Sequence, residues 1–518
     1  CEKNLMSLLK YQKNVDKQEV IFASSLRDKL NDIVESHQKA FSQPNFLVNS
    51  IIEAARITLT SIESLLGEKI FIGQYGDEFD HIDLKLKKLI AFLVEMDIVS
   101  SFKFLLPSSD WPDIICVDGK MHPIILRDGI KRHFSGAHGN GVAFDYNGAA
   151  YKAVAELIER YSLAVYDTNK FIYGSYSQLL EQNAINPELF SGFSKRQMLN
   201  DKFKKRHGFD NDTKFKWMSA RSLYSTKEYL VPAQLVYMTY DCNYEKEPII
   251  RQTTTSGAAA GSNWTMAAYN AICETIEREA FMVFWLNKIS PPKFDLNTFT
   301  HPQLQRLLGQ CRNFGIDLHL LDITTDIEIP TVLAIIIDPL ASKKIVNVTA
   351  CADINLEEAA LHAAMECLKI GVLRKPLTQE KTRINLFNKC PRTIDERKRY
   401  WANSSLIPHM SFLLNGPLQS FQKNSNYINC YDQKLEILTK KLKELNLDIY
   451  LADVTTDVAR KGGLKVLMSL IPNLYPLYLN EEYKYLGIKR LYDVPRKIGY
   501  SRNECNEEDF NLIPHPFL

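Results

Sequence analysis

Apolar residues in roughly the first hundred positions recur mostly at helical spacing. Between Ser50 and Leu66 they return every three or four residues, which predicts an amphipathic helix, and Ile82–Met96 repeats the pattern. The shorter apolar runs Ile70–Ile72 and Ile98–Leu106 have the length of strands. Strand, helix and strand in so small a space predict a winged-helix-like module.

The stretch Leu106–Pro112 interrupts both periodicities, because it combines two prolines with polar residues. We therefore expect a domain boundary at residue 112. On this interpretation residues 1–112 form a mainly helical, winged-helix-like N-terminal module, and residues 113–518 form the main domain.

The main domain repeats its own pattern. Residues 149–160 read AAYKAVAELIER and residues 267–278 read AAYNAICETIER, while 359–366, AALHAAME, is a weaker third copy. The pentapeptides DITTD (322–326) and DVTTD (453–457) also match, and each lies between two strand-like apolar runs. These repeats predict an α+β fold of duplicated sheet-plus-helix units, in which small residues let Ala-rich helices approach the sheets.

Composition narrows the class of protein. Among the 518 residues 45% are apolar and 24% charged, as in ordinary soluble proteins, and a net charge of +2 gives no general attraction to nucleic acid. The longest apolar runs, such as Val332–Ile337, are far too short to span a bilayer. Ten cysteines without a C-x-x-C pair indicate a reducing cytoplasm. The chain begins at Cys1, which leaves open whether this is the native N-terminus.

Two pairs of carboxylates stand out in the repeated helices. Glu156 and Glu159 are three residues apart and share one helical face, and Glu274 and Glu277 do the same. Four carboxylates that converge between two related helices would need a cation, and Mg2+ with phosphate oxygens suits them. Pairing of each Glu with the arginine that follows is an equally good explanation of the spacing.

Glycine-rich segments precede both helices. They read SGAHGNG (135–141) and TSGAAAGS (255–262), and backbone N–H groups of such turns can hold a phosphate at a helix N-terminus. A glycine-rich turn together with paired carboxylates, present twice, indicates a nucleotide–metal site.

These motifs together resemble the YcaO family over residues 118–518. The two Glu-x-x-Glu-Arg segments, DVTTD (453–457), IPNLYP (471–476) and YLG (485–487) are similar to that family. The resemblance implies Mg2+ held by Glu156, Glu159, Glu274 and Glu277. It also implies ATP bound by Ser135, Gly139, Asn140, Gly141, Glu156, Ser256, Ser262 and Arg278.

The resemblance further implies an activity. Azoline-forming members cyclise Cys, Ser or Thr of a ribosomally made precursor peptide onto the preceding carbonyl, and ATP phosphorylates the amide oxygen so that it can leave. Such members commonly end in a Pro-x-Pro-x-Pro tail that reaches the active site. This chain ends with Pro514, His515, Pro516, Phe517 and Leu518, which gives two of the three prolines and makes Pro514, His515, Pro516 and Leu518 catalytic candidates. An extended, unattached terminus is the alternative.

Some positions depart from the family pattern. Asn140 stands where the family usually has Lys, and Thr265 and Met266 stand where it has an acidic pair, so one metal-binding carboxylate is missing. Ser262 aligns with a family Asn, and the neighbouring Asn263 is the residue that would substitute as an oxygen ligand.

Partners and competing functions follow from the resemblance. The N-terminal module is either a leader-peptide-binding element or a plain accessory module. A ThiF-like partner protein and a flavin-dependent azoline dehydrogenase are the expected protein partners, and a homodimer stays open. The alternatives to azoline formation are another YcaO amide activation, giving a thioamide or amidine, and a degenerate scaffold that binds peptide or a partner enzyme.

Overall fold

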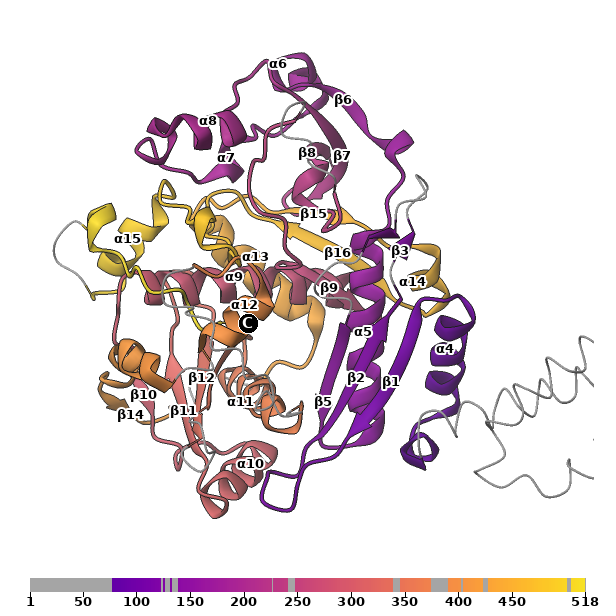
Figure 1. The fold of residues 1–518 in the computed structure, drawn as a ribbon, viewed down its shortest axis with the longest axis vertical. Coiled ribbons are helices and arrows are strands. Elements are labelled where there is room, and N and C mark those ends of the chain that lie inside the picture. Colours follow the sequence, from indigo (N-terminus) through magenta and orange to yellow (C-terminus); the bar gives the residue numbers. More distant parts are fainter. Residues whose placement is uncertain are drawn as a thin grey trace, which may run out of the picture. The chain divides into compact units, whose positions relative to one another are not determined.

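The computed structural model describes residues 77–122, 124–125, 131–132, 138–225, 227–240, 247–338, 345–373, 390–401, 404–422, 427–500 and 505–517 (Figure 1). The chain divides into two compact units, Cys1–Phe104 and Leu105–Leu518. The functional division expected at residue 112 stays a prediction. None of the helices in these ranges is long and apolar enough to cross a membrane.

The described part of the first unit contains η2 (Asp77–His81), α4 (Leu84–Glu95) and β1 (Val99–Leu105). The predicted helix Ile82–Met96 begins at Leu84, because Asp83 caps it by accepting a hydrogen bond from the Leu86 N–H at 2.8 Å. The predicted elements over 50–66 and 70–72 lie outside the described residues. The winged-helix-like module therefore stays a prediction.

The second unit begins with a strand pair covered by one helix. Strands β2 (Ile115–Met121) and β5 (His138–Ala143) are antiparallel, and α5 (Tyr146–Ala164) packs on them. A short pair, β3 (Ile124–Ile125) and β4 (Lys131–Arg132), lies between them in the sequence. The helix lies so close to β5 that a Cβ on Gly141 would stand 1.9 Å from the Ala149 carbonyl oxygen.

A second sheet has the strand order β6-β7-β15-β16-β9, with β8 paired to β7, and these pairings are antiparallel. Its strands are β6 (Ile172–Ser175), β7 (Lys214–Ser222), β8 (Glu228–Pro232), β9 (Ala258–Gly261), β15 (Tyr450–Asp453) and β16 (Lys465–Leu470). The third sheet has the order β13-β12-β11-β10-β14. It consists of β10 (Lys293–Phe294), β11 (Asp317–Asp322), β12 (Thr331–Asp338), β13 (Ile345–Ala352) and β14 (Leu418–Gln419).

Two further Ala-rich helices pack on these sheets. Helix α9 (Trp264–Leu286) crosses the middle of the unit and contacts β9, β16 and β13, and α11 (Leu356–Leu373) packs on β12 and β13 (Figure 1). Each copy of the pentapeptide motif joins two antiparallel strands, and its Asp accepts a hydrogen bond from the backbone two residues on, Asp322 from Thr324 and Asp453 from Thr455. The predicted α+β fold of duplicated sheet-plus-helix units is confirmed.

The remaining elements surround these layers. The helices are α6 (Tyr176–Leu179), α7 (Glu188–Ser191), α8 (Asp201–His207), α10 (Pro302–Asn313), α12 (Ile394–Trp401), α13 (Tyr431–Glu444), α14 (Asp457–Lys461) and α15 (Arg490–Lys497). The 3-10 turns are η3 (Thr168–Lys170), η4 (Leu180–Gln182), η5 (Gln197–Leu199), η6 (Ala233–Leu235), η8 (Ser404–Leu414), η9 (Glu481–Tyr483) and η10 (Glu507–Asp509).

The close packing of α5 on β5 predicts that alanine substitution at two glycines, Gly141 and Gly309, has opposite effects on the free energy of unfolding. Gly141→Ala should lower the free energy of unfolding by about 2 kcal/mol or more, because backbone atoms at 1.9 Å cannot yield to a methyl group. Gly309→Ala, inside α10 and with no atom closer than 3.9 Å, should raise it by about 0.5–1 kcal/mol. Thermal unfolding of both variants checks this, and equal stabilities would contradict the packing argument.

Candidate functional site

The first Glu of each repeated pair is held in the same way in α5 and α9. Glu156 Oε2 accepts a hydrogen bond from the Asn140 N–H at 2.6 Å, and Glu274 Oε2 accepts one from the Gly257 N–H at 3.0 Å. In both cases the donor lies on the segment that precedes the helix. The duplication in the sequence is therefore a duplication of the local structure around the carboxylates.

The glycine-rich segments differ from the turns expected. The first is strand β5 where it is described, so Gly139 and Gly141 serve the close approach of α5, and the Asn140 N–H is engaged by Glu156. The second turns at Gly257, whose φ of +90° favours glycine, and then forms β9. Ser135 lies outside the described residues. A direct role of these segments in ATP binding stays a prediction, as it does for Ser256 and the exposed Ser262.

Each pair also carries its own cation. Arg160 Nε donates to Glu156 at 3.0 Å, and an Arg278 Nη atom donates to Glu274 at 2.7 Å while the other Nη donates to Glu277. The Glu156 and Glu274 side chains are still 25% and 24% exposed, so water and ligands can reach them. The Glu–Arg pairing is thus present and both carboxylates stay accessible, while their role as a metal site stays a prediction.

The carboxylates of the two helices come together. Burial, then the Glu274 and Glu156 carboxylates, raise the pKa of Glu159 well above its ordinary value. Repulsion between groups on α5 and α9 requires that they lie close to one another. Glu159 of α5 therefore lies near Glu274 of α9, while the convergence of all four carboxylates on one metal stays a prediction.

Helix α11 adds residues that were not among the predicted site residues. Burial and the carboxylates of Glu274 and Glu366 raise the pKa of Glu277 to about 8. Although burial acts in the opposite direction, Lys369 and Lys152 hold the pKa of Glu366 below its ordinary value. A signal for Glu366 was present, because the third Ala-rich repeat ends at this residue.

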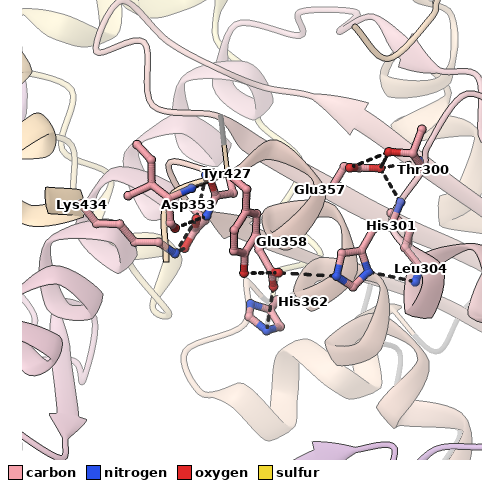
Figure 2. A network of polar contacts seen from close by, with 11 residues as sticks. Thr300, His301, Leu304, Asp353, Glu357, Glu358, His362, Tyr427 and Lys434 are labelled. Atoms are coloured by element: carbon pink, nitrogen blue, oxygen red, sulfur yellow. Dashed lines mark hydrogen bonds and ion pairs between the residues drawn. The ribbon is translucent and has the colours of Figure 1, made fainter. Parts of the chain in front are cut away.

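A polar network occupies the N-terminal end of α11 (Figure 2). The Tyr427 hydroxyl donates to Glu358 at 2.9 Å, and His301 and His362 face the same carboxylate. Nearby, Lys434 Nζ pairs with Asp353 at 2.9 Å and lies over aromatic rings. The sequence pattern did not reveal this network, because its members come from separate segments.

The C-terminal tail is docked on α9 and α12. The indole N–H groups of Trp285 and Trp401 donate to the carbonyls of Ile513 and Pro514, at 3.1 and 3.0 Å. The Phe517 ring packs on Phe281, and the Arg278 guanidinium lies 4.7 Å from its centroid. The tail therefore contacts a residue of the carboxylate cluster, although Leu518 itself lies outside the described residues.

His515 is positioned as an anchor of this tail. The His515 side chain is completely buried, and its Nε2–H donates to the Tyr478 carbonyl at 2.7 Å. The backbone carbonyl of His515 accepts a hydrogen bond from Arg397, also at 2.7 Å. Burial and the Arg397 charge lower the pKa of His515 well below its ordinary value. A buried neutral imidazole fits a role in docking the tail, and Pro514 and Pro516 are likewise buried beside it, so the catalytic role of these residues stays a prediction.

The residues that depart from the family pattern have structural roles. Asn263 Oδ1 caps α9 by accepting from the Met266 N–H at 2.9 Å, so it is committed to the helix rather than free to replace a ligand. Ser262, beside it, contacts the Met266 sulfur at 3.5 Å.

The cluster fits Mg2+ and a nucleotide by charge. Within the described ranges, no three His, Cys, Asp or Glu side chains stand close enough to form a ready metal site. Burial and two neighbouring carboxylates raise the pKa of Glu159 well above its ordinary value, so the ionised form of this side chain is disfavoured. A divalent cation beside the carboxylates would favour the ionised form, and Arg160, Arg278 and Lys369 place positive charge nearby for phosphate oxygens.

Known proteins resemble this chain in sequence and in fold. An uncharacterised protein of Methanothermobacter thermautotrophicus is 24% identical over 269 residues, which is 51% of this chain and 67% of that protein. A heterocyclase solved in complex with substrate and cofactor superposes with a TM-score of 0.68 at 21% identity, over 81% of this chain and 55% of the heterocyclase. A YcaO protein from Methanopyrus kandleri, bound with AMPPCP and Mg2+, superposes with a TM-score of 0.52 at 15% identity, over 76% of this chain and 91% of that one. The chain thus spans about half the length of the heterocyclase.

A family model adds the decisive match. The family described as YcaO cyclodehydratase, ATP- and Mg2+-binding, matches residues 140–475, which include the repeated helices and both pentapeptide motifs. This chain belongs to the YcaO family, whose members bind ATP and Mg2+.

Proposed function

We propose that this chain is an ATP-dependent cyclodehydratase that converts Cys, Ser or Thr of a ribosomally made precursor peptide into thiazoline or oxazoline. The observation that carries the proposal is the joint placement of the carboxylate cluster and the tail. Phe517 lies on Arg278, and Arg278 holds Glu274 and Glu277. A metal–nucleotide site with the chain's own C-terminus against it suits chemistry on a bound peptide.

The four carboxylates would hold Mg2+, as the family description implies. ATP supplies the phosphoryl group that converts a poor leaving group, the amide oxygen, into a good one. Arg160 and Arg278 orient the carboxylates and, with Lys369, reduce repulsion between them and an incoming polyphosphate. The Phe517 ring of the tail covers one side of the Arg278 guanidinium.

Substrate delivery requires further parts. The heterocyclase that resembles this chain was solved with a substrate, and this chain covers 55% of it. We infer that a leader peptide is bound either by the N-terminal module or by a separate ThiF-like partner, and that a flavin-dependent dehydrogenase oxidises the azolines. These steps would take place in the cytoplasm.

A degenerate scaffold is the second candidate. It is favoured by Asn140 and Met266, which stand where Lys and an acidic residue are usual, and by the capping role of Asn263. Such a scaffold would bind peptide or a partner enzyme without turnover.

Peptide-dependent phosphate release separates the two candidates. We expect the full chain, with Mg2+ and ATP, to release phosphate when given a short Cys-, Ser- and Thr-rich peptide encoded beside its gene. Mass spectrometry should show the loss of one water per ring. Tight peptide binding without phosphate release or mass loss would establish the scaffold instead.

Removing one buried charge should have opposite effects on stability and on nucleotide binding. The folded-state pKa of Glu159 is raised by burial and by neighbouring carboxylates, so at neutral pH its charge destabilises the folded protein, and Glu159→Gln should raise Tm by roughly 1–2 °C. The same change should weaken Mg2+–AMPPCP binding at least tenfold, measured by calorimetry. Glu508→Gln, which alters an exposed carboxylate, should change neither; a Glu159→Gln protein that binds normally would remove this residue from the site.

The tail can be tested without unfolding its anchor. Phe517→Ala removes the ring from Arg278 and should lower ring formation at least tenfold while Mg2+–AMPPCP binding changes less than threefold. The control is Leu512→Ala in the same tail, because Leu512 is 75% exposed. Normal ring formation by the Phe517→Ala protein would mean that the tail only completes the fold.

A further inference from the structure

Glu358 lies at the centre of the network at the N-terminal end of α11 (Figure 2). Its Oε1 accepts a hydrogen bond from the Tyr427 hydroxyl at 2.9 Å and lies 3.6 Å from His301 Nε2, and its Oε2 lies 4.0 Å from His362 Nε2. Tyr427 thus holds this carboxylate by a hydrogen bond, and the two imidazoles lie close to it without a hydrogen bond.

A hydrogen bond determines the tautomer of one of the two imidazoles. His301 Nδ1 caps α10 by accepting from the Leu304 N–H at 3.4 Å, so the ring proton is on Nε2 and faces Glu358. His362 Nε2 lies 4.0 Å from a Glu358 oxygen, and approach of these two atoms would favour the proton on Nε2 and leave a lone pair on Nδ1. Within the ranges that the structure covers, His362 makes no hydrogen bond, and its side chain is 44% exposed.

Helix α11 presents His362 towards the carboxylate cluster. Glu358, His362, Glu366 and Lys369 follow one another at helical spacing on one face. The opposite face is tied to the sheet, because Asn347 and Thr349 donate to the carbonyls of Cys367 and Ala363 at 2.8 and 2.9 Å. Glu366 interacts with Glu277, and Lys369 with Glu156, so His362 lies one helical turn from the site.

The surroundings also decide the charge of His362. The protein packed around the ring, although 44% of the side chain is exposed, and then Lys152 on α5 lower the pKa of His362 below its ordinary value, while Glu358, Asp353 and Glu366 act in the opposite direction. The balance leaves a neutral imidazole at neutral pH, with an accessible lone pair.

We propose that Glu358 and His362 form the proton-accepting dyad of the cyclisation step, with His362 as the catalytic base and Glu358 as its positioning residue. The inference rests on the proposed function. His362 Nδ1 takes the proton of the Cys thiol, or of the Ser or Thr hydroxyl, as the sulfur or oxygen bonds to the preceding carbonyl carbon. The π electrons of that carbonyl move to its oxygen, which then takes the γ-phosphoryl group of a nucleoside triphosphate, and the nucleoside diphosphate leaves. Phosphate then leaves with this oxygen as the ring nitrogen loses its proton to water and forms the C=N bond.

The nucleophile gives a sharp test of the base. With a precursor peptide that carries either Ser or Cys at one position, His362→Asn should lower ring formation from Ser by about a hundredfold or more. The loss with Cys should be smaller and should diminish as the pH approaches about 8.5, because a thiol ionises there without help. Mg2+–AMPPCP affinity should change less than twofold, and His409→Asn, at an exposed histidine elsewhere in the unit, should have no effect.

The positioning role of Glu358 has its own readout. Because the Glu358 charge raises the pKa of His362, Glu358→Gln should move the acidic limb of the rate profile to lower pH as well as reduce the maximum rate. A merely structural role would reduce the rate without moving that limb.

A second measurement does not depend on the substrate. Diethylpyrocarbonate reacts with unprotonated, accessible imidazoles, so peptide mapping of the full chain should show modification of His362, with a half-maximal rate below pH 6.5. An unreactive His362, or a His362→Asn protein that cyclises the Ser peptide within threefold of the wild-type rate, would overturn the dyad. A wild-type protein that forms no ring from any peptide would instead overturn the proposed function.

Discussion

The candidate site depends on how closely three helices can approach their sheets. In α5 and α9 the small residues of the repeat leave so little space that added methyl groups on Gly141 and Gly261 would meet backbone atoms at 1.9 and 2.5 Å. Helices at that distance from their strands place the carboxylates within reach of strand N–H groups, as with Asn140 and Glu156. Larger residues at these positions would move the helices outward and separate the acidic groups. The geometry of the candidate site therefore depends on the small residues that permit this packing.

Gathering carboxylates in this way has an electrostatic cost, and the structure shows how it is reduced. Arg160, Arg278 and Lys369 each lie against an acidic neighbour on their own helix. Burial, and after it the nearby carboxylates, nevertheless raise the pKa of Glu159 well above its ordinary value and that of Glu277 to about 8, so the charged form of each is disfavoured. A cation bound between these carboxylates would remove the repulsion between them. The free energy of that repulsion would therefore contribute to cation binding.

The sequence predicted this architecture well where the information was local. Repeats at constant offset identified the helices and the paired carboxylates, and spacing alone showed that Glu156 and Glu159 share a face. The first glycine-rich segment was expected to be a turn, because glycine often marks turns, yet here the missing side chains serve close packing in β5. The network around Glu358 could not be predicted, because His301, His362 and Tyr427 are distant in the sequence and meet only after folding.

The composition of the tail predicted its stiffness, but the residues that it contacts could not be predicted from the sequence. Two prolines predicted a stiff terminus, but its partners, Trp285, Trp401 and Arg397, come from α9 and α12, far away along the chain. Helix α9 joins the two systems, since its middle carries Glu274 and Glu277 and its C-terminal end carries Phe281 and Trp285 against the tail. Arg278 lies between these two parts, with the carboxylates on one side and the Phe517 ring on the other. Undocking the tail would expose this guanidinium to water and weaken its hold on both glutamates, so the order of the last residues and the charge balance of the site are physically linked.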